Sequence, residues 1–478
     1  MGSLNIVDVL IIFTYFVLCV VLALYRSKKI KTITEYTIGS GYFPDTVVLS
    51  TIFMTFIGAP QVVGAVGKVY ELGLFFAITE LTAPLLWFIT LIVFAKNINR
   101  FSGCISIGDV MALLYGSIGR WVTNIASILI SIGLISVQAL ALGYAIEYFL
   151  QVPKVLGMCV GMSILIFYST FGGIRAVAIT DVFQFVILII AIPIACSFAY
   201  RDIGGYSGIM RSVPQGLVVL DLNKENIFLF CSLIFYAILP INSGPYIQRF
   251  LMVSSSKQLT HVIKFIPVIH FAFVFIICMI GFIIKGLAPS IDPNNALYYL
   301  VDHYTAMGLK GLLVSGILAI IMSSADSWLN TAGVLCAHDI VKRIFPKLTD
   351  SNELKIARIS TCCIGIIAIV IASISEGILE LLWFADNFWY PITIIPLAAG
   401  FWGFRTNCKS FFVHLVFAVV CVCIGAYLEG SFSTVSLMFG IVGSAVGLFG
   451  MHYWQAYRGT LNITAQPIRF MERVRNEG

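Results

Sequence analysis

Residues Gly316–Asn330 read GILAIIMSSADSWLN, and this stretch decides the fold because it places polar side chains inside a hydrophobic run long enough to cross a bilayer. Ser323, Ser324 and Ser327 recur at helical spacing and share one face, with Asp326 at its edge. A carboxylate at membrane depth is expensive and is retained where it meets a partner, water or an ion. Hydroxyl and carboxylate oxygens suit a small hard cation. We therefore expect this helix to hold a cation inside the membrane.

The composition of the whole chain is that of a membrane protein. Of its 478 residues, 59% are hydrophobic and 11% are charged, and the mean hydropathy is +0.98. These values lie far outside the usage of soluble globular domains. Because lipid-exposed backbone must satisfy its own hydrogen bonds, the expected fold class is an all-α polytopic membrane protein. The net charge of +6 does not predict nucleic-acid binding, since the basic residues fall in short loops.

Hydropathy predicts thirteen spans, most of them near the roughly 20 residues that a helix needs to cross. They run over Asn5–Tyr25, Asp45–Val69, Leu74–Ala95, Trp121–Leu150, Val155–Phe171, Val177–Ala199, Ile227–Ile247, Val262–Ile284, Leu312–Val341, Ile356–Ile374, Ile378–Trp402, Ser410–Leu428 and Val435–Tyr453. With the N-terminus outside, most Lys and Arg residues, Arg249 among them, fall in cytoplasmic loops. This excess of basic residues on the cytoplasmic side supports the odd number of spans and a cytoplasmic C-terminus.

Two of these spans carry matching interruptions. The second contains Gly58-Ala59-Pro60, and the seventh contains Pro240 followed by Asn242-Ser243-Gly244-Pro245. Paired interruptions indicate an inverted-repeat transporter with its site at the midplane, whereas a single kink would indicate a bent bundle helix. The expected division is a leader span and cytoplasmic loop (1–44), a first repeat (45–200), a second repeat (201–405), two further spans (406–457) and a short basic cytoplasmic tail (458–478).

Two motifs together resemble the sodium:solute symporter family. The first is Gly172-Gly173-Ile174-Arg175-Ala176-Val177 with Thr180-Asp181 and Gln184, and the second is Met322-Ser323-Ser324-Ala325-Asp326-Ser327 with Asn330 and Asp339-Ile340. The resemblance implies a five-plus-five inverted-repeat fold with flanking helices. It also implies a protein of the cell (inner) membrane that imports a small organic solute with Na⁺ by alternating access. The solutes of the family members that it resembles are amino acids, sugars, vitamins, sialic acid and quaternary amines.

The resemblance further implies a principal sodium site. It falls on the carbonyls of Met54, Ile57 and Ile320 and on the hydroxyls of Ser323 and Ser324. Unwound carbonyls are free acceptors, and Na⁺ can be held by neutral oxygens. The alternative for both serines is a hydrogen bond back to the carbonyl one turn earlier in the helix.

A second cation or proton site is implied at Asp181, Asp326 and Ser327. In some members of the family the matching positions hold a second sodium, but here the carboxylate of Asp326 replaces a hydroxyl. Two carboxylates that approach each other would repel, and a second cation or a shared proton would relieve that repulsion. The structural alternative for Asp181 is a charge stabilised at a helix N-terminus.

The expected substrate-binding residues are Gln61, Glu80, Tyr236, His270 and Phe384. Gln61 and Glu80 match sugar-binding positions of sodium–galactose members, whereas Tyr236 and His270 replace an asparagine and a lysine there. Gln61 and Glu80 would also suit an amine-bearing or amide-bearing solute. Aromatic residues such as Phe384 can stack on a ring or enclose a cation, and ordinary helix packing is the alternative. A packing role is likewise the alternative for His270.

Asp386 and Asn387 are expected to be gate residues that line the outer vestibule, next to a local break at Pro391. Three other classes are alternatives: a transporter-fold sensor or receptor, a membrane enzyme, and a proton-coupled or uncoupled carrier. The chain has no GxSxG or HExxH motif, and the segment after Arg458 is too short for a catalytic domain. We therefore expect no enzyme, with a small organic solute and lipid as partners, no nucleic acid and no obligatory protein partner.

Overall fold

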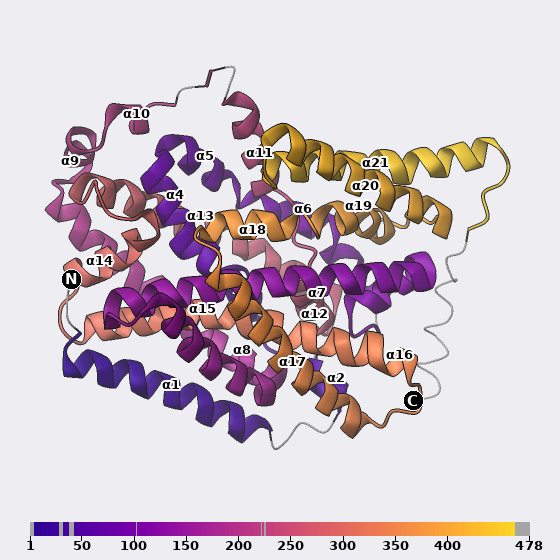
Figure 1. The fold of residues 1–478 in the computed structure, drawn as a ribbon, viewed down its shortest axis with the longest axis horizontal. Helices are drawn as coiled ribbons and strands as arrows, with labels where there is room; N and C mark the ends of the chain where they lie inside the picture. The colour runs from indigo at the N-terminus through magenta and orange to yellow at the C-terminus, as the bar shows by residue number, and fades with distance from the viewer. Residues whose placement is uncertain are drawn as a thin grey trace.

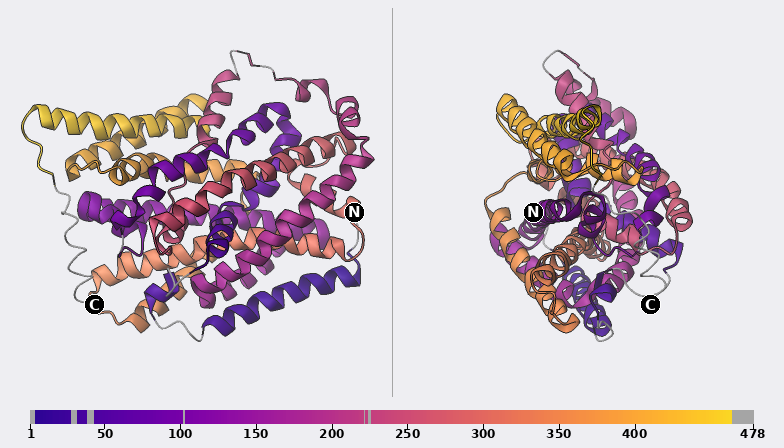
Figure 2. Two further views of the ribbon diagram at one scale, coloured as in Figure 1. Left: turned by 180° about the vertical axis from the view of Figure 1, so that it is seen from behind. Right: turned by 90° about the vertical axis from the view of Figure 1, so that its right-hand side faces the viewer.

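The computed structural model describes residues 4–27, 32–37, 43–101, 103–220, 222–223 and 226–463. Every regular element in these ranges is a helix, which confirms the all-α class. Eight helices are long and apolar enough to cross a membrane, or nine if the bent pair within 45–72 counts as one span. Among them, α7 (Ile107–Leu150), α20 (Cys408–Glu429) and α21 (Thr434–Tyr457) run along the long axis of the molecule, and α20 and α21 lie at one edge of the bundle (Figures 1 and 2). Residues 464–478 of the predicted tail lie outside the described ranges.

The elements follow in chain order. Before residue 205 they are α1 (Ile6–Ser27), α2 (Ile33–Thr37), α3 (Asp45–Phe56), η1 (Pro60–Gly64), α4 (Ala65–Leu72), α5 (Leu74–Thr82), α6 (Leu85–Val93), η2 (Ala95–Phe101), α7 (Ile107–Leu150) and α8 (Lys154–Asp202). They continue as α9 (Gly205–Ser212), α10 (Gln215–Val218), α11 (Ile227–Ala237), α12 (Gly244–Leu251), α13 (Ser256–Leu287), η3 (Pro293–Asn295), α14 (Ala296–Tyr304), α15 (Leu309–Val334), η4 (Leu335–Val341), α16 (Lys342–Ile344), α17 (Asp350–Ser373), α18 (Ile378–Asp386), α19 (Tyr390–Phe401), α20 (Cys408–Glu429) and α21 (Thr434–Tyr457).

The polar stretch quoted at the outset lies on α15, the most enclosed of the eight long spans. In its most apolar part, 94% of the residues are buried inside the protein. It packs against α1, α3, α7, α8, α12 and α17, and in Figure 1 it runs the length of the molecule between α7 and α1. The serines and the aspartate of α15 therefore face other helices rather than lipid, which is where intramembrane polar groups are tolerated.

The predicted break in the second span is present. α3 ends just before Ile57, which is extended (φ −79°, ψ 101°), and the two halves of the span are bent by 64°. Pro60 has no N–H to continue the helical ladder. A Cβ on Gly58 would lie 2.5 Å from Gln138 Nε2 and 2.8 Å from Ser324 Oγ. Only glycine therefore lets α7 and α15 pack directly on the unwound backbone.

The predicted break in the seventh span is also present, between α11 and α12. Side chains from other parts of the chain form hydrogen bonds with the residues of the broken segment. The Ile241 N–H donates to Thr90 Oγ1 at 3.0 Å. The Asn242 side chain donates to Thr393 Oγ1 at 3.2 Å and accepts from Trp389 Nε1 at 3.1 Å. Non-helical backbone at membrane depth is tolerated where protein groups take over its hydrogen bonds in this way. The local break expected near Pro391 separates α18 from α19.

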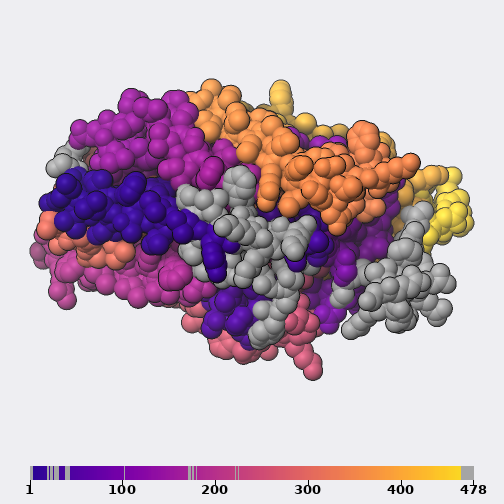
Figure 3. Space-filling view, turned by 90° about the horizontal axis from the view of Figure 1, so that it is seen from below, coloured from indigo at the N-terminus to yellow at the C-terminus, as the bar shows by residue number. Residues whose placement is uncertain are grey.

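Asp8 on α1 caps the N-terminus of α15. Its Oδ1 accepts hydrogen bonds from the backbone N–H groups of Gly308 and Gly311, both at 2.8 Å. A Cβ on Gly311 would lie 2.6 Å from the Asp8 Cα, so the two helices touch at this point. Figure 3 shows α1 in indigo on the surface of the bundle beside α8. The carboxylate satisfies two orphan donors and complements the positive end of the helix dipole.

Replacing Asp8 by alanine is expected to lower the free energy of unfolding by about 1–2 kcal/mol, because two buried N–H groups lose their acceptor. Thermal unfolding of the purified protein measures this loss, and Asp8→Asn should lose less because an amide oxygen still accepts. The exposed carboxylate of Glu147 offers the control variant Glu147→Ala. Equal melting temperatures for Asp8→Ala and Glu147→Ala would contradict the cap.

Candidate functional site

Ser324 places its hydroxyl at the unwound end of α3. Its Oγ lies 3.2 Å from the carbonyl oxygen of Met54, 3.4 Å from that of Thr55 and 3.1 Å from that of Ile57. Because the helix ends here, these carbonyls lack the amide partners of a continuing helix. The oxygens are all neutral and come from two different spans. This donor set fits a sodium ion that links α3 to α15.

The neighbouring Ser323 hydroxyl is held by a carboxylate of α8. It donates to Asp181 Oδ1, and Thr51 Oγ1 donates to Asp181 Oδ2 at 2.6 Å. Since the hydroxyl hydrogen points to Asp181, the lone pairs of Ser323 remain available to a cation. Ile320 lies buried one turn earlier on α15. The structure thus brings Met54, Ile57 and Ser324 into contact, with Ser323 beside them and bonded to Asp181.

The functional residue that sequence reasoning misplaced is Arg249. The distribution of basic residues predicts a cytoplasmic loop at this position, but α12 continues past Arg249 and buries it completely, at 0% exposure. Its Nη2 donates to Ser327 Oγ at 2.7 Å, and Ser327 in turn donates to Asp326 Oδ1 at 3.4 Å. Asp181 and Asp326 both lie within electrostatic range of this guanidinium. The signal in the sequence is Pro245, which opens a new helix four residues before Arg249.

Asp181, Arg249 and Asp326 form a buried group of ionisable side chains. Asp181 and Asp326 are carboxyl groups buried in the protein interior, and Arg249 supplies one positive charge beside them. A buried charge is retained where an opposite charge offsets it. The guanidinium therefore relieves the repulsion for which the sequence alone implied a second cation or a proton. With both carboxyl groups ionised, one negative charge next to Ser323 would have no positive partner in this group.

A cavity of about 80 Å³ lies on the other side of the α3 break. Four of the five predicted substrate residues line it, and they come from different spans. Its lining includes Phe56, Gln61, Glu80, Tyr236, His270, Trp383 and Tyr390. Gln61 joins this cavity to the break, because its Oε1 accepts a hydrogen bond from the Gly58 N–H at 3.1 Å.

Two hydrogen bonds fix the polar wall of the cavity. The Tyr236 hydroxyl donates to Asp386 Oδ2 at 2.6 Å, which places this carboxylate directly behind the tyrosine. Trp87 Nε1 donates to His270 Nδ1 at 3.1 Å, and the His270 ring packs 5.0 Å from the ring of Phe56. His270 therefore has a packing role and lines the cavity as well.

The structure does not bring Phe384 to the cavity. This side chain is 45% exposed and packs against Phe388 and Phe432, because its neighbour Trp383 occupies the cavity face of α18. Asn387 is also engaged elsewhere. It accepts a hydrogen bond from Ser436 Oγ at 2.8 Å, at the start of α21. Asp386 is thus the predicted gate residue that lies nearest the cavity wall.

A contact that the sequence did not reveal joins α4 to α18. Lys68 Nζ lies 2.7 Å from Glu71 Oε2 and 2.6 Å from Glu380 Oε1. These residues line a second, more open cavity of about 560 Å³. Lys68 and Glu380 are far apart in the sequence, and neither stands out from its neighbours. The ion pair holds α4, the second half of the broken span, against α18.

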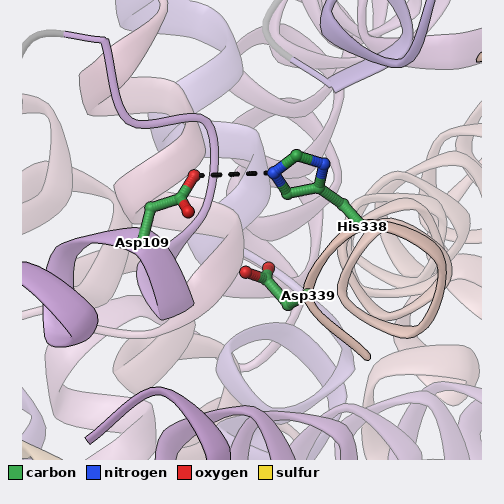
Figure 4. A group of neighbouring side chains, drawn as sticks. All are labelled: Asp109, His338 and Asp339. Carbon is green, nitrogen blue, oxygen red and sulfur yellow. Dashed lines mark ion pairs between the residues drawn. The ribbon is translucent and has the colours of Figure 1, made fainter. Parts of the chain in front are cut away.

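A further charged cluster lies where α7, η4 and α17 meet. Asp109, His338 and Asp339 point toward one another, as Figure 4 shows. Arg120 Nη1 lies 3.0 Å from Asp109 Oδ1 and 2.9 Å from Asp339 Oδ1, and His338 Nδ1 lies 2.8 Å from Glu353 Oε1. The guanidinium occupies the position between the carboxylates that a metal ion would need. We therefore interpret the cluster as an ion-pair network that fastens three helices together.

Comparison with solved structures identifies the fold. A Na⁺-coupled sialic acid symporter in its substrate-bound outward-open state superposes with a TM-score of 0.77 at 19% identity, covering 94% of this chain and 98% of the other. A nucleobase-cation-symport-1 family transporter in a closed conformation gives a TM-score of 0.57 at 12% identity, covering 91% and 96%. The helix arrangement is therefore that of secondary transporters.

Comparison with known sequences identifies the family. The Vibrio parahaemolyticus sodium/glucose cotransporter is 24% identical over 79% of this chain and 76% of its own length. The Escherichia coli sodium/pantothenate symporter is 21% identical over 89% and 90%. A zebrafish (Danio rerio) sodium/glucose cotransporter 4 is 24% identical over 58% of this chain, but the match spans only about half (49%) of that relative. The sequence model of the sodium:solute symporter family matches residues 36–402, and the chain therefore belongs to this family.

Proposed function

We propose that this protein is a Na⁺-coupled symporter that imports a small organic solute by alternating access. One observation carries the proposal: the Ser324 hydroxyl lies among the carbonyls of Met54 and Ile57 at the broken end of α3. We assign the sodium site to these residues with Ile320 and Ser323. We assign the solute site to Gln61, Glu80, Tyr236 and His270, which line the neighbouring cavity. The sodium cotransport named for the relatives supports Na⁺ as the coupling ion.

The short connection between the two sites explains how they are coupled. Sodium at Ser324 would hold the Ile57 carbonyl in place, and the next residue, Gly58, is bonded to Gln61 in the cavity wall. Fixing the break therefore also fixes a solute-binding side chain. Coupling requires only that each ligand bind one state better than the other. The sodium gradient drives uptake, with about 2.3 kcal/mol per charge for each 100 mV of membrane potential.

We further propose thirteen spans arranged as two inverted repeats over 45–200 and 201–405, with the leader and the 406–457 pair outside them. The eight long spans and the bent pair support this count together with four shorter apolar helices, which are Ile6–Leu18, Lys154–Thr170, Ile227–Ala237 and Tyr390–Phe401. Matching breaks in the second and seventh spans support the repeat. The distribution of basic residues favours an outside N-terminus and a cytoplasmic C-terminus in the cell membrane.

The buried Arg249 favours one sodium ion per solute. It offsets one of the two carboxylates, Asp181 and Asp326, and sodium at Ser324 would offset the other. We therefore expect Asp326→Asn to leave the sodium-to-solute ratio of transport unchanged at about one. Fluxes of radioactive sodium and of the solute measured together in proteoliposomes give this ratio. A ratio that falls in the variant would place a second cation at Asp181, Asp326 and Ser327.

A thermal-shift screen followed by uptake tests the proposal. Purified protein is heated with sugars, amino acids, vitamins and amines in matched NaCl and KCl buffers. A solute that binds the folded state raises the melting temperature, and sodium coupling predicts a larger rise in NaCl. That solute should then accumulate in proteoliposomes only under an inward sodium gradient. Accumulation that ignores the sodium gradient at fixed voltage would rule out the symporter.

A further inference from the structure

The cavity next to Gln61 has an acidic side chain in its wall without a basic partner there. Glu80 lines the cavity and makes no hydrogen bond or ion pair with any residue that the structure describes. No lysine or arginine lines it. His270 accepts the hydrogen bond from Trp87 at Nδ1, so its proton is on Nε2 and the imidazole is neutral. Within the described chain, nothing in the wall balances the Glu80 carboxylate.

A second carboxylate lies one hydrogen bond behind the wall. Asp386 is 5% exposed, and its Oδ2 accepts from the hydroxyl of Tyr236, which itself lines the cavity. No ion pair joins Asp386 to a basic residue of the described ranges. Arg249 does not serve this purpose, because it lies with Asp181 and Asp326 on the sodium side of α3. The cavity is therefore bordered by two acidic residues and by no cationic one.

The rest of the wall suits a positively charged guest. Rings of Phe56, Tyr236, Trp383 and Tyr390 line the cavity. Aromatic faces attract cations, most strongly where water is excluded. Burying an unpaired carboxylate is costly, so a site of this kind is completed by a ligand that brings the missing charge. The volume of about 80 Å³ suits a small solute.

We propose that this cavity binds a small organic cation, a solute with a protonated or quaternary amine whose nitrogen is held by Glu80 inside the aromatic wall. The inference rests on the proposed function, because it names the class of solute that is carried with sodium. A neutral polyol would leave the carboxylates without compensation, and an organic acid would add a third negative charge. The charge of a solute therefore determines its binding to this site more than its shape does.

Solutes of similar size but different charge test whether the cavity selects a cation. Thermal shifts of the full-length protein in NaCl are measured with ethanolamine, ethylene glycol and glycolate, then with 4-aminobutanol, 1,4-butanediol and 4-hydroxybutyrate, and with choline. The amines should raise the melting temperature, and the diols and acids should not. Choline against ethanolamine separates a quaternary from a primary amine. The inference is overturned if no amine stabilises the protein, or if a diol or acid stabilises it as strongly as its matched amine.

Variants test the assignment to Glu80. Glu80→Gln should weaken amine binding about thirtyfold or more, since the ligand charge loses its buried partner, while the exposed control Glu147→Gln should bind as the native protein does. If Glu80→Gln does not fold, Asp386→Asn carries the same prediction, because its amide oxygen still accepts from Tyr236. Native amine affinity in a folded Glu80→Gln protein would overturn the assignment.

The same measurements repeated in KCl separate this inference from the proposed function. Amine stabilisation of equal size in NaCl and KCl supports the cation site but contradicts sodium coupling. Sodium-dependent stabilisation by a diol or an acid alone overturns the cation site and leaves sodium coupling intact.

Discussion

Arg249→Met is expected to lower the free energy of unfolding by about 3–5 kcal/mol, because it leaves buried carboxylates without their positive partner. Arg249 is fully buried, donates to Ser327 and lies within electrostatic range of Asp181 and Asp326. Methionine fills much of the same volume, so lost packing contributes little to the effect. Thermal unfolding of the detergent-purified protein measures the loss, and a poor yield of folded protein would agree with it.

A second substitution shows whether the unpaired buried charge causes this loss of stability. Adding Asp326→Asn to Arg249→Met removes one of the stranded carboxylates and should restore a large part of the stability. The exposed arginine Arg458 provides the control variant Arg458→Met, which should unfold as the native protein does. If Arg249→Met keeps the native melting temperature, or if Asp326→Asn brings no rescue, the electrostatic account of this group is wrong.

Ser324→Ala is expected to weaken the apparent affinity for sodium by about ten- to a hundredfold, because an uncharged donor that contacts the ion is removed while the helix is retained. The Ser324 hydroxyl lies within 3.4 Å of three carbonyls at the α3 break. Sodium-dependent thermal stabilisation of the purified variant measures the shift without knowledge of the solute. The yield of folded protein should stay close to native.

Ser315→Ala is the matched control on the same helix. The Ser315 hydroxyl is buried and donates to the Gly311 carbonyl one turn earlier at 2.7 Å, which is the ordinary role of a serine in a membrane helix. This variant should respond to sodium as the native protein does. Equal sodium responses of Ser324→Ala and Ser315→Ala would remove the assignment of Ser324 to the ion site.

The backbone breaks could be predicted from the sequence because their cause is local. Pro60 and Pro240 each remove a donor, whatever packs around them, and the structure breaks both spans there. The enclosure of α15 could also be predicted, because a carboxylate such as Asp326 is tolerated at membrane depth only inside the protein. Local chemistry and the cost of burial together gave the fold class and the surroundings of the site.

Features that depend on tertiary contacts could not be predicted. Arg249 follows a short polar stretch and has the sequence pattern of a loop residue, but α12 carries it into the core. The Lys68–Glu380 ion pair joins two distant spans, and nothing near either residue indicates the other. The aromatic character of Phe384 predicts a place at the substrate site, whereas the orientation of α18 leaves this side chain partly exposed and packed against Phe432. The periodicity of apolar residues indicates which face of a helix is buried, but it does not indicate which neighbouring helix that face contacts.

Equilibrium binding of radioactive sodium to the purified protein tests the central claim most directly, because it requires no knowledge of the solute. We expect saturable binding of about one sodium ion per protein molecule, with an affinity reduced at least about tenfold in Ser324→Ala and unchanged in Ser315→Ala. Absence of saturable sodium binding by the native protein, or equal affinity in Ser324→Ala, would contradict the claim that α15 and the broken α3 hold the coupling ion.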